Sequence, residues 1–145
     1  MTDTPDTLVQ ASAVAIDGRA LLIEGPPGSG KSSLALALID RGAGLIGDDG
    51  VSLMPESGTV LAACPPNIAG LIEVRGVGLV RLPATEQAPL ALILTLGGES
   101  ERLPETLATR TIFDIEIPVL PFDPGAIAPA VRAEWALREH GLPLT

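Results

Sequence analysis

Several residue types are scarce in this chain, and each scarcity excludes a class of protein. The 145 residues include one cysteine, one histidine and no tyrosine. The lone cysteine, Cys64, excludes an internal disulfide, and together with one histidine it cannot form a zinc cluster. Lys and Arg number 9 against 18 Asp and Glu, which gives a formal net charge of −9. Such a chain lacks the basic surface and the stacking rings of a typical nucleic-acid-binding protein.

Long apolar runs and targeting signals are missing as well. No apolar stretch approaches the roughly 18–20 residues that span a bilayer. The first residues include Asp3 and Asp6 rather than basic side chains, which does not resemble a secretory signal. We therefore expect a cytoplasmic protein with neither a membrane nor a nucleic-acid partner. At 145 residues and 46% hydrophobic composition, we predict one domain over 1–145, with a loose segment at 1–7.

Turn and strand signals predict an α/β fold with a mixed β-sheet, an N-terminal β-hairpin and few helices. The hairpin is indicated by Asp17-Gly18 between two β-prone runs. The segment IEVRGVGLVRL is interpreted as strand, kink, strand, and residues 97–112 give no clear signal. The predicted helices cover 31–41 and 126–139, and the other predicted strands cover 44–47, 51–53, 59–63 and 90–96.

The most specific motif is Gly25-Pro26-Pro27-Gly28-Ser29-Gly30-Lys31-Ser32, which matches G-x-x-x-x-G-K-[ST] at every fixed position. Glycines let backbone N–H groups wrap a polyphosphate, and the following helix directs its positive end at the same anion. The lysine reaches the β- and γ-phosphates, and the serine hydroxyl suits Mg²⁺. The alternative is a Gly/Pro-rich turn that happens to precede Lys-Ser.

Two acidic features follow. Asp48 and Asp49 come directly after a short apolar strand, which in such a domain places carboxylates beside the γ-phosphate and Mg²⁺. The alternative is an Asp-Asp-Gly turn with local Asx hydrogen bonds. Glu73 precedes Arg75 on a strand that leads into Gly-x-Gly, so it is a candidate metal ligand. Its alternative is an ordinary charged pair on a surface strand.

Together these segments resemble the C-terminal catalytic domain of the HPr kinase/phosphorylases. The resemblance is carried by GPPGSGKSSLALALIDRGAGLIGDDGVSL, by PPNIAGLIEVRGVGLVRL and by RLPE near Arg102. The chain is most similar to the short form of alphaproteobacteria, which has the kinase domain alone. The resemblance implies a P-loop kinase-like fold and an ATP-dependent kinase. Its substrate would be a serine of HPr, the phosphocarrier protein of the sugar phosphotransferase system.

The same resemblance implies roles for individual residues. The stretch from Gly25 to Ser33 binds the nucleotide phosphates, and Lys31 contacts the transferring group. Ser32 and Glu73 hold Mg²⁺. Asp49 matches the residue that accepts the proton of the substrate serine, with Asp48 beside it. The full-length family forms hexamers, so a homo-oligomer is a further expectation.

Three positions depart from the family pattern. Gln10 stands where a histidine is usual, Ser33 replaces an acidic residue, and Asp123-Pro124-Gly125-Ala126 lacks the arginine of the full-length members. Glutamine cannot carry a proton at physiological pH, so we expect phosphorolysis to be impaired or absent. Two other functions stay open: a nucleotide-binding regulator or degenerate pseudo-kinase without phosphoryl transfer, and, ranked lower, a small-molecule P-loop kinase.

Overall fold

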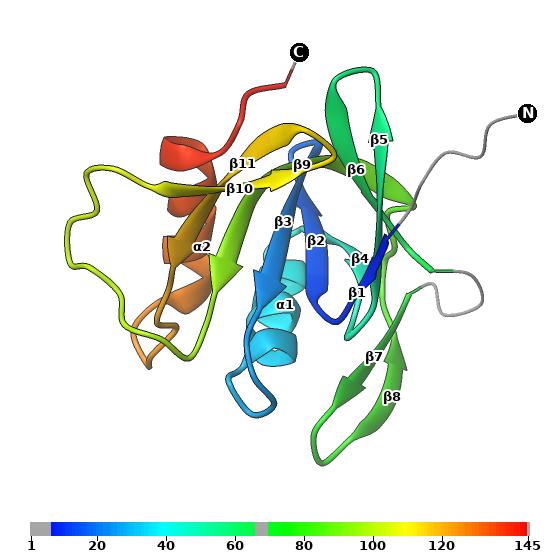
Figure 1. Ribbon diagram of the computed structural model, residues 1–145. Coiled ribbons are helices and arrows are strands. Elements are labelled where there is room, and N and C mark those ends of the chain that lie inside the picture. The colour runs from blue at the N-terminus through cyan, green and yellow to red at the C-terminus, as the bar shows by residue number, and fades with distance from the viewer. Residues whose placement is uncertain (1–6, 66–69, 145) are drawn as a thin grey trace, which may run out of the picture.

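The computed structural model describes residues 7–65 and 70–144 (Figure 1). The predicted N-terminal hairpin is confirmed: β2 (Ser12–Ile16) pairs antiparallel with β3 (Arg19–Glu24), with Ile16 opposite Arg19. Asp17 and Gly18 have φ values of 51° and 84°, as a type I′ turn requires. The predicted loose segment lies outside the described residues except for Thr7, which begins β1 (Thr7–Val9).

The chain then builds a strand–loop–helix–strand unit. After β3 comes α1 (Lys31–Asp40), one residue shorter than predicted, and then β4 (Gly44–Gly47) with the predicted bounds. β4 pairs antiparallel with β2, which is antiparallel to β3. β3 and β4 therefore run in the same direction, and their carboxyl ends lie at the same edge of the sheet.

The remaining strands complete a mixed sheet of nine. β5 (Val51–Glu56), β6 (Thr59–Ala63) and β9 (Gln87–Thr95) lead to the order β1-β5-β6-β9-β3-β2-β4. β9 is parallel to β3 and also to β11 (Ile115–Pro121), which pairs with β10 (Ala108–Ile112). This mixed, curled sheet, with two helices in the part of the chain that the structure describes, confirms the predicted fold class. β10 lies in the segment that gave no clear sequence signal.

One predicted element differs in kind. The segment interpreted as strand, kink, strand is a hairpin of β7 (Leu71–Val74) and β8 (Gly78–Arg81) that forms a separate two-stranded sheet. Gly76 and Gly78 have φ values of 81° and 125°, so the glycines reverse the chain instead of bending one strand. In Figure 1 this hairpin projects at the end of the molecule where the β3–α1 loop lies.

The second helix, α2 (Pro129–His140), begins three residues later than predicted. Ala128 has φ of 44°, a left-handed conformation that a right-handed helix cannot include. The residues before it form the β11–α2 loop, here residues 122–128. Neither α1 nor α2 is long and apolar enough to cross a membrane, and these are the helices of the described ranges.

The core lies on both faces of the sheet because side chains alternate along each strand. Leu21 and Ile23 face α1 and α2, whereas Ala20 and Leu22 face the layer formed by the curled strands. Burial on both faces fixes the register of β3, since a slip by one residue would exchange the two faces. The end of β3 therefore has a fixed position, and the loop that follows it starts from a rigid strand.

Candidate active site

The loop from Gly25 to Gly30, called the glycine-rich loop below, joins β3 to α1. Gly28 and Gly30 have φ values of 82° and 100°, a region that favours glycine. A turn bond runs from Ser29 N to Pro26 O at 3.1 Å, and Leu34 N donates to Gly30 O at 2.9 Å at the start of the helix. The backbone thus reverses and enters the helix with its first N–H groups at the mouth of the loop.

Close packing against the end of β9 fixes the path of this loop. A Cβ at Gly25 would lie 2.5 Å from Ser29 Oγ and 3.0 Å from Leu96 O, and a Cβ at Gly97 would lie 3.0 Å from Pro26 Cδ. Ser29 Oγ itself is buried and has no hydrogen-bond partner within the described ranges. A buried hydroxyl without a partner is unusual; this one packs against Gly25, where a side chain would displace it.

Lys31 follows at the first position of α1. Its Nζ donates to Gly25 O at 2.8 Å and to Pro26 O at 3.4 Å. The ammonium therefore lies over the glycine-rich loop and adds a full positive charge to the partial charge of the helix N-terminus. These donors together suit an anion with several oxygens, such as a polyphosphate.

The acidic pair meets α1 at the carboxyl end of β4. Ser32 Oγ donates to Asp48 Oδ1 at 2.6 Å, so Asp48 is joined to the helix that follows the glycine-rich loop. Asp49 is exposed and has φ of 58°. The sequence left a purely local Asx turn open for this pair, but the Asp48 carboxylate accepts hydrogen bonds from two other elements, one of them α1.

The second element that donates to Asp48 is β2, through Ser12, a residue that the sequence did not single out. Ser12 Oγ donates to the same Asp48 Oδ1 at 2.9 Å and accepts from Asp49 N at 3.5 Å. Its signal was a hydroxyl inside the apolar run Ala11-Ser12-Ala13-Val14, where a buried polar group needs a partner.

A second missed feature is an ion pair beside the glycine-rich loop. Arg110 Nη1 on β10 donates to Glu24 Oε2 at 2.7 Å, and Glu24 directly precedes Gly25. The hydrogen bond to Glu24 raises the pKa of Arg110, with burial acting in the opposite direction. The pair connects two segments 86 residues apart, and no local pattern in the sequence indicates it.

The β11–α2 loop borders the glycine-rich loop on another side. A Cβ at Gly30 would lie 3.9 Å from Pro124 Cγ. Arg132 donates to the carbonyl oxygens of Asp123, Pro124 and Ile127, and its guanidinium lies 4.9 Å from the centre of the Phe122 ring. One α2 side chain therefore holds this loop in place.

Not every predicted residue is brought together. Glu73 is exposed on β7, opposite Leu79. Across residues 7–65 and 70–144, no group of three or more Asp, Glu, His or Cys side chains gathers as a metal site, so Glu73 does not form one cluster with Asp48 and Asp49. The oxygen donors that do meet, Ser32 and Asp48, are of the kind that Mg²⁺ prefers. A nucleotide-bound Mg²⁺ needs few protein ligands because it keeps phosphate and water ligands.

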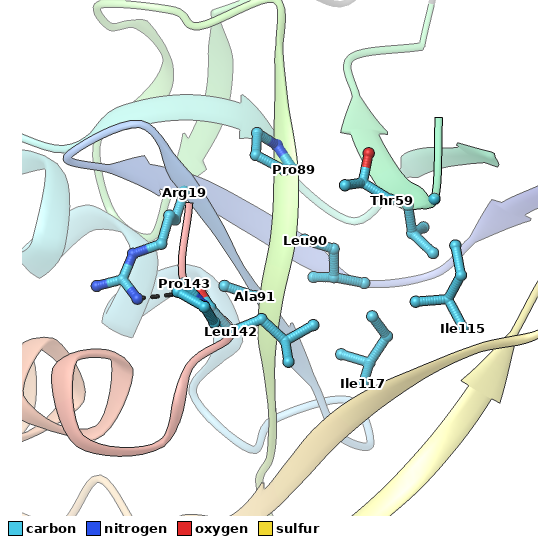
Figure 2. A pocket seen from close by; sticks show the side chains of 11 residues that line it. Arg19, Thr59, Pro89, Leu90, Ala91, Ile115, Ile117, Leu142 and Pro143 are labelled. Atoms are coloured by element: carbon cyan, nitrogen blue, oxygen red, sulfur yellow. Dashed lines mark hydrogen bonds between the residues drawn. The ribbon is translucent and has the colours of Figure 1, made fainter. Parts of the chain in front are cut away.

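A separate apolar cavity of about 150 Å³ lies near the start of β9 (Figure 2). It is lined in part by Leu90, Ile115, Ile117 and Leu142. β3 and β9 are parallel, so this cavity lies toward the opposite end of the strands from the glycine-rich loop. Leu142 N donates to Ala91 O at 2.9 Å, which ties the C-terminal segment to the sheet there. Neither the glycine-rich loop with Lys31 nor the acidic pair lines this cavity.

The fold and the site define a class: α/β proteins in which a glycine-rich loop leads from a strand into a helix beside an acidic turn. Residues 3–128 match the family model described as HPr Serine kinase C-terminal domain. The chain therefore belongs to the HPr serine kinase C-terminal domain family.

Individual relatives agree with this assignment. The chain is 41% identical over 76 residues to an HPr kinase/phosphorylase of Clostridium botulinum and 44% identical over 77 residues to one of Bordetella pertussis. Each alignment covers 52% of this chain and 25% of the relative, so the matched segment is a quarter of those proteins. The structure of the Hpr(Ser) kinase/phosphatase from Coxiella burnetii superposes with a TM-score of 0.78 at 27% identity, covering 92% of this chain and 90% of that one.

Proposed function

We propose that this chain is an ATP-dependent kinase that phosphorylates a serine of an HPr-type phosphocarrier protein. The observation that carries the proposal is the junction of Ser32, Asp48 and Asp49. The Ser32 hydroxyl, on the helix after the glycine-rich loop, donates to the Asp48 carboxylate, and the next residue, Asp49, has an exposed carboxylate. Membership of the HPr serine kinase family supports the choice of substrate.

In the proposed reaction, the serine oxygen of the partner attacks the γ-phosphorus of ATP. A new O–P bond forms as the bond from the γ-phosphorus to the bridging oxygen breaks, ADP leaves, and Asp49 accepts the serine proton. The exposure of Asp49 lets a protein substrate reach it. Lys31 and the loop N–H groups stabilise the charge on the transferring group.

Ser32 and Glu73 are the proposed protein ligands of Mg²⁺, which would neutralise charge on the β- and γ-phosphate oxygens. The bond between Ser32 and Asp48 supports the first ligand, because it places a hydroxyl and a carboxylate together beside the glycine-rich loop. The second rests on the family resemblance. Glu73 lies on the hairpin that projects at the same end of the molecule (Figure 1).

The test is incubation of the purified chain with HPr and MgATP, followed by mass spectrometry of HPr peptides. The proposal expects one phosphoserine that is absent when ATP or Mg²⁺ is omitted. HPr left unmodified by a chain that binds ATP would contradict it.

That contrary result would favour a nucleotide-binding regulator without phosphoryl transfer, and the position of Gln10 supports this second function. Gln10 is exposed two residues before Ser12, which contacts the acidic turn. A glutamine there cannot exchange a proton with this turn, so we also expect phosphorolysis to be weak or absent. Release of phosphate from phosphoserine-HPr, measured with and without inorganic phosphate, tests that expectation.

A further inference from the structure

Ser12 is a polar residue in an apolar environment. It is fully buried, and it alone is buried among the polar and charged residues that the structure describes. It lies on β2 between Ala11 and Ala13, opposite Ile23 of β3. A hydroxyl removed from water lowers stability unless hydrogen bonds compensate. An apolar residue would fill this position without that requirement, so the hydroxyl calls for an explanation.

The hydrogen bonds of Ser12 all lead to the acidic turn. Its hydroxyl donates to Asp48 Oδ1 at 2.9 Å and accepts from Asp49 N at 3.5 Å. Ser32 donates to the same Oδ1 at 2.6 Å. One carboxylate oxygen therefore joins β2, α1 and the turn after β4. Two of the segments it joins carry the proposed metal ligand Ser32 and the proposed proton acceptor Asp49.

The turn itself needs external support. Asp49 has φ of 58°, a left-handed conformation that is unfavourable for most residues with a side chain. A Cβ at Gly47 would collide with Gly50 O, so the chain reverses tightly between these two glycines. Strained turns of this kind persist only where neighbouring groups hold them. Ser12 contacts both the Asp48 side chain and the Asp49 backbone, and it does so from a strand buried on both sides.

We propose that Ser12 is a positioning residue for phosphoryl transfer. Its hydroxyl holds the Asp48 carboxylate toward Ser32 and holds the Asp49 backbone in its left-handed turn. The metal-binding hydroxyl and the proton acceptor thereby keep a fixed relation. The role rests on the proposed function, but its effect on metal binding is measurable without HPr.

The chemistry explains why a second donor matters. Ser32 can bind a metal ion through a lone pair of its oxygen while its O–H still donates to Asp48, so the direction of the Ser32 hydroxyl depends on where the Asp48 carboxylate is held, and Ser12 is the second donor that holds it. Removal of the Ser12 hydroxyl leaves Asp48 without this anchor. We expect the loss to reduce kcat and the Mg²⁺-dependent part of nucleotide affinity, with little effect on KM for HPr.

The experiment compares Ser12→Ala, Ser12→Cys and Ser12→Thr with the matched control Ser52→Ala, a half-buried serine on β5. Titration calorimetry gives the affinity for ADP with Mg²⁺ and with EDTA, and the ratio is the Mg²⁺-dependent gain. We expect Ser12→Ala and Ser12→Cys to reduce this gain at least about fivefold and kcat at least about tenfold, since small displacements of reacting groups have large effects on rate. Ser12→Thr restores both to within about threefold, and Ser52→Ala changes neither.

A double-mutant cycle separates positioning from general stability. If Ser12 acts through Asp48, the Ser12→Ala change has no further effect on the Mg²⁺-dependent gain once Asp48→Ala is present. If each substitution instead reduces the Mg²⁺-dependent gain independently, so that their fold-changes multiply in the double variant, the proposal is wrong. A wild-type gain and kcat in folded Ser12→Ala would also overturn it, as would the failure of both Ser12→Ala and Ser12→Cys to fold. If the wild-type chain does not phosphorylate HPr but Ser12→Ala still loses the gain, the proposed function fails, whereas the role of Ser12 in positioning Asp48 and Ser32 for Mg²⁺ stands.

Discussion

Replacement of Gly25 by alanine isolates the steric requirement of the glycine-rich loop. Gly25 is not among the glycines with positive φ, so an alanine there meets no unfavourable backbone conformation. Its methyl would lie 2.5 Å from Ser29 Oγ, 3.0 Å from Leu96 O and 3.1 Å from Leu96 Cβ. The serine hydroxyl can rotate away, but Leu96 O belongs to the main chain directly after β9 and Leu96 Cβ is fixed to that main chain. The glycine-rich loop must therefore move away from the sheet.

Overpacking of this kind lowers the free energy of unfolding by about 1–3 kcal/mol. The displacement also moves the N–H groups that face the proposed phosphates, so we expect ADP affinity to fall by at least about tenfold. Gly58→Ala is the matched control. Gly58 has φ of 81° and no neighbour within 4 Å of its added Cβ, and it lies in the β5–β6 turn. That variant loses about 1 kcal/mol through backbone strain alone and keeps its ADP affinity.

Urea unfolding and ADP titration of both variants measure these effects. The reasoning is refuted if Gly25→Ala binds ADP as the wild type does. It is equally refuted if Gly58→Ala loses ADP affinity to the same extent, because the loss would then follow stability and not the loop.

Three further predictions concern single side chains. Glu73→Gln weakens the Mg²⁺-dependent gain in ADP affinity while affinity in EDTA stays unchanged; equal losses in both conditions would remove Glu73 from the metal site. Arg110→Met lowers the free energy of unfolding by less than about 1 kcal/mol, because the pair is partly exposed. Arg110→Met also weakens ADP binding, because the negative charge of Glu24 beside the glycine-rich loop is no longer neutralised. Adding Glu24→Gln to that variant restores ADP binding; if the double variant still binds ADP weakly, the charge of Glu24 is not the cause. Partial burial raises the pKa of the Cys64 thiol, so its alkylation by iodoacetamide at pH 8 is slower than that of a free thiol and accelerates as pH rises further; a rate equal to that of a free thiol would contradict the raised pKa.

The sequence predicted those elements whose signals are local. A type I′ turn requires positive φ at two successive residues, which Asp17-Gly18 tolerates, so this dipeptide between two β-prone runs predicted the hairpin of β2 and β3. The apolar run after Gly42 and the acidic pair after Gly47 defined β4 to the residue. The glycine-rich loop was recognised because its spacing of glycines, lysine and serine reflects one chemical task.

What escaped prediction depends on contacts between distant segments. The bond from Ser12 to Asp48 spans 36 residues and the pair of Glu24 with Arg110 spans 86, so neither leaves a periodic pattern. The β7–β8 hairpin was taken as one kinked strand because two glycines are compatible with both shapes. The prediction that α2 begins at residue 126 was wrong because Ala128 has a left-handed conformation. The β11–α2 loop that contains Ala128 is held by contacts of Arg132.

The most direct test of the central claim is a single-turnover measurement of phosphoserine formation on HPr by the wild type and by Asp49→Asn, at saturating MgATP. Asparagine keeps the shape of the side chain and cannot accept the serine proton. We predict that Asp49→Asn binds MgADP within about threefold of the wild type but transfers phosphoryl at least about a hundredfold more slowly. Equal transfer rates in the two proteins would contradict the role of Asp49, and no transfer by the wild type would contradict the proposed function itself.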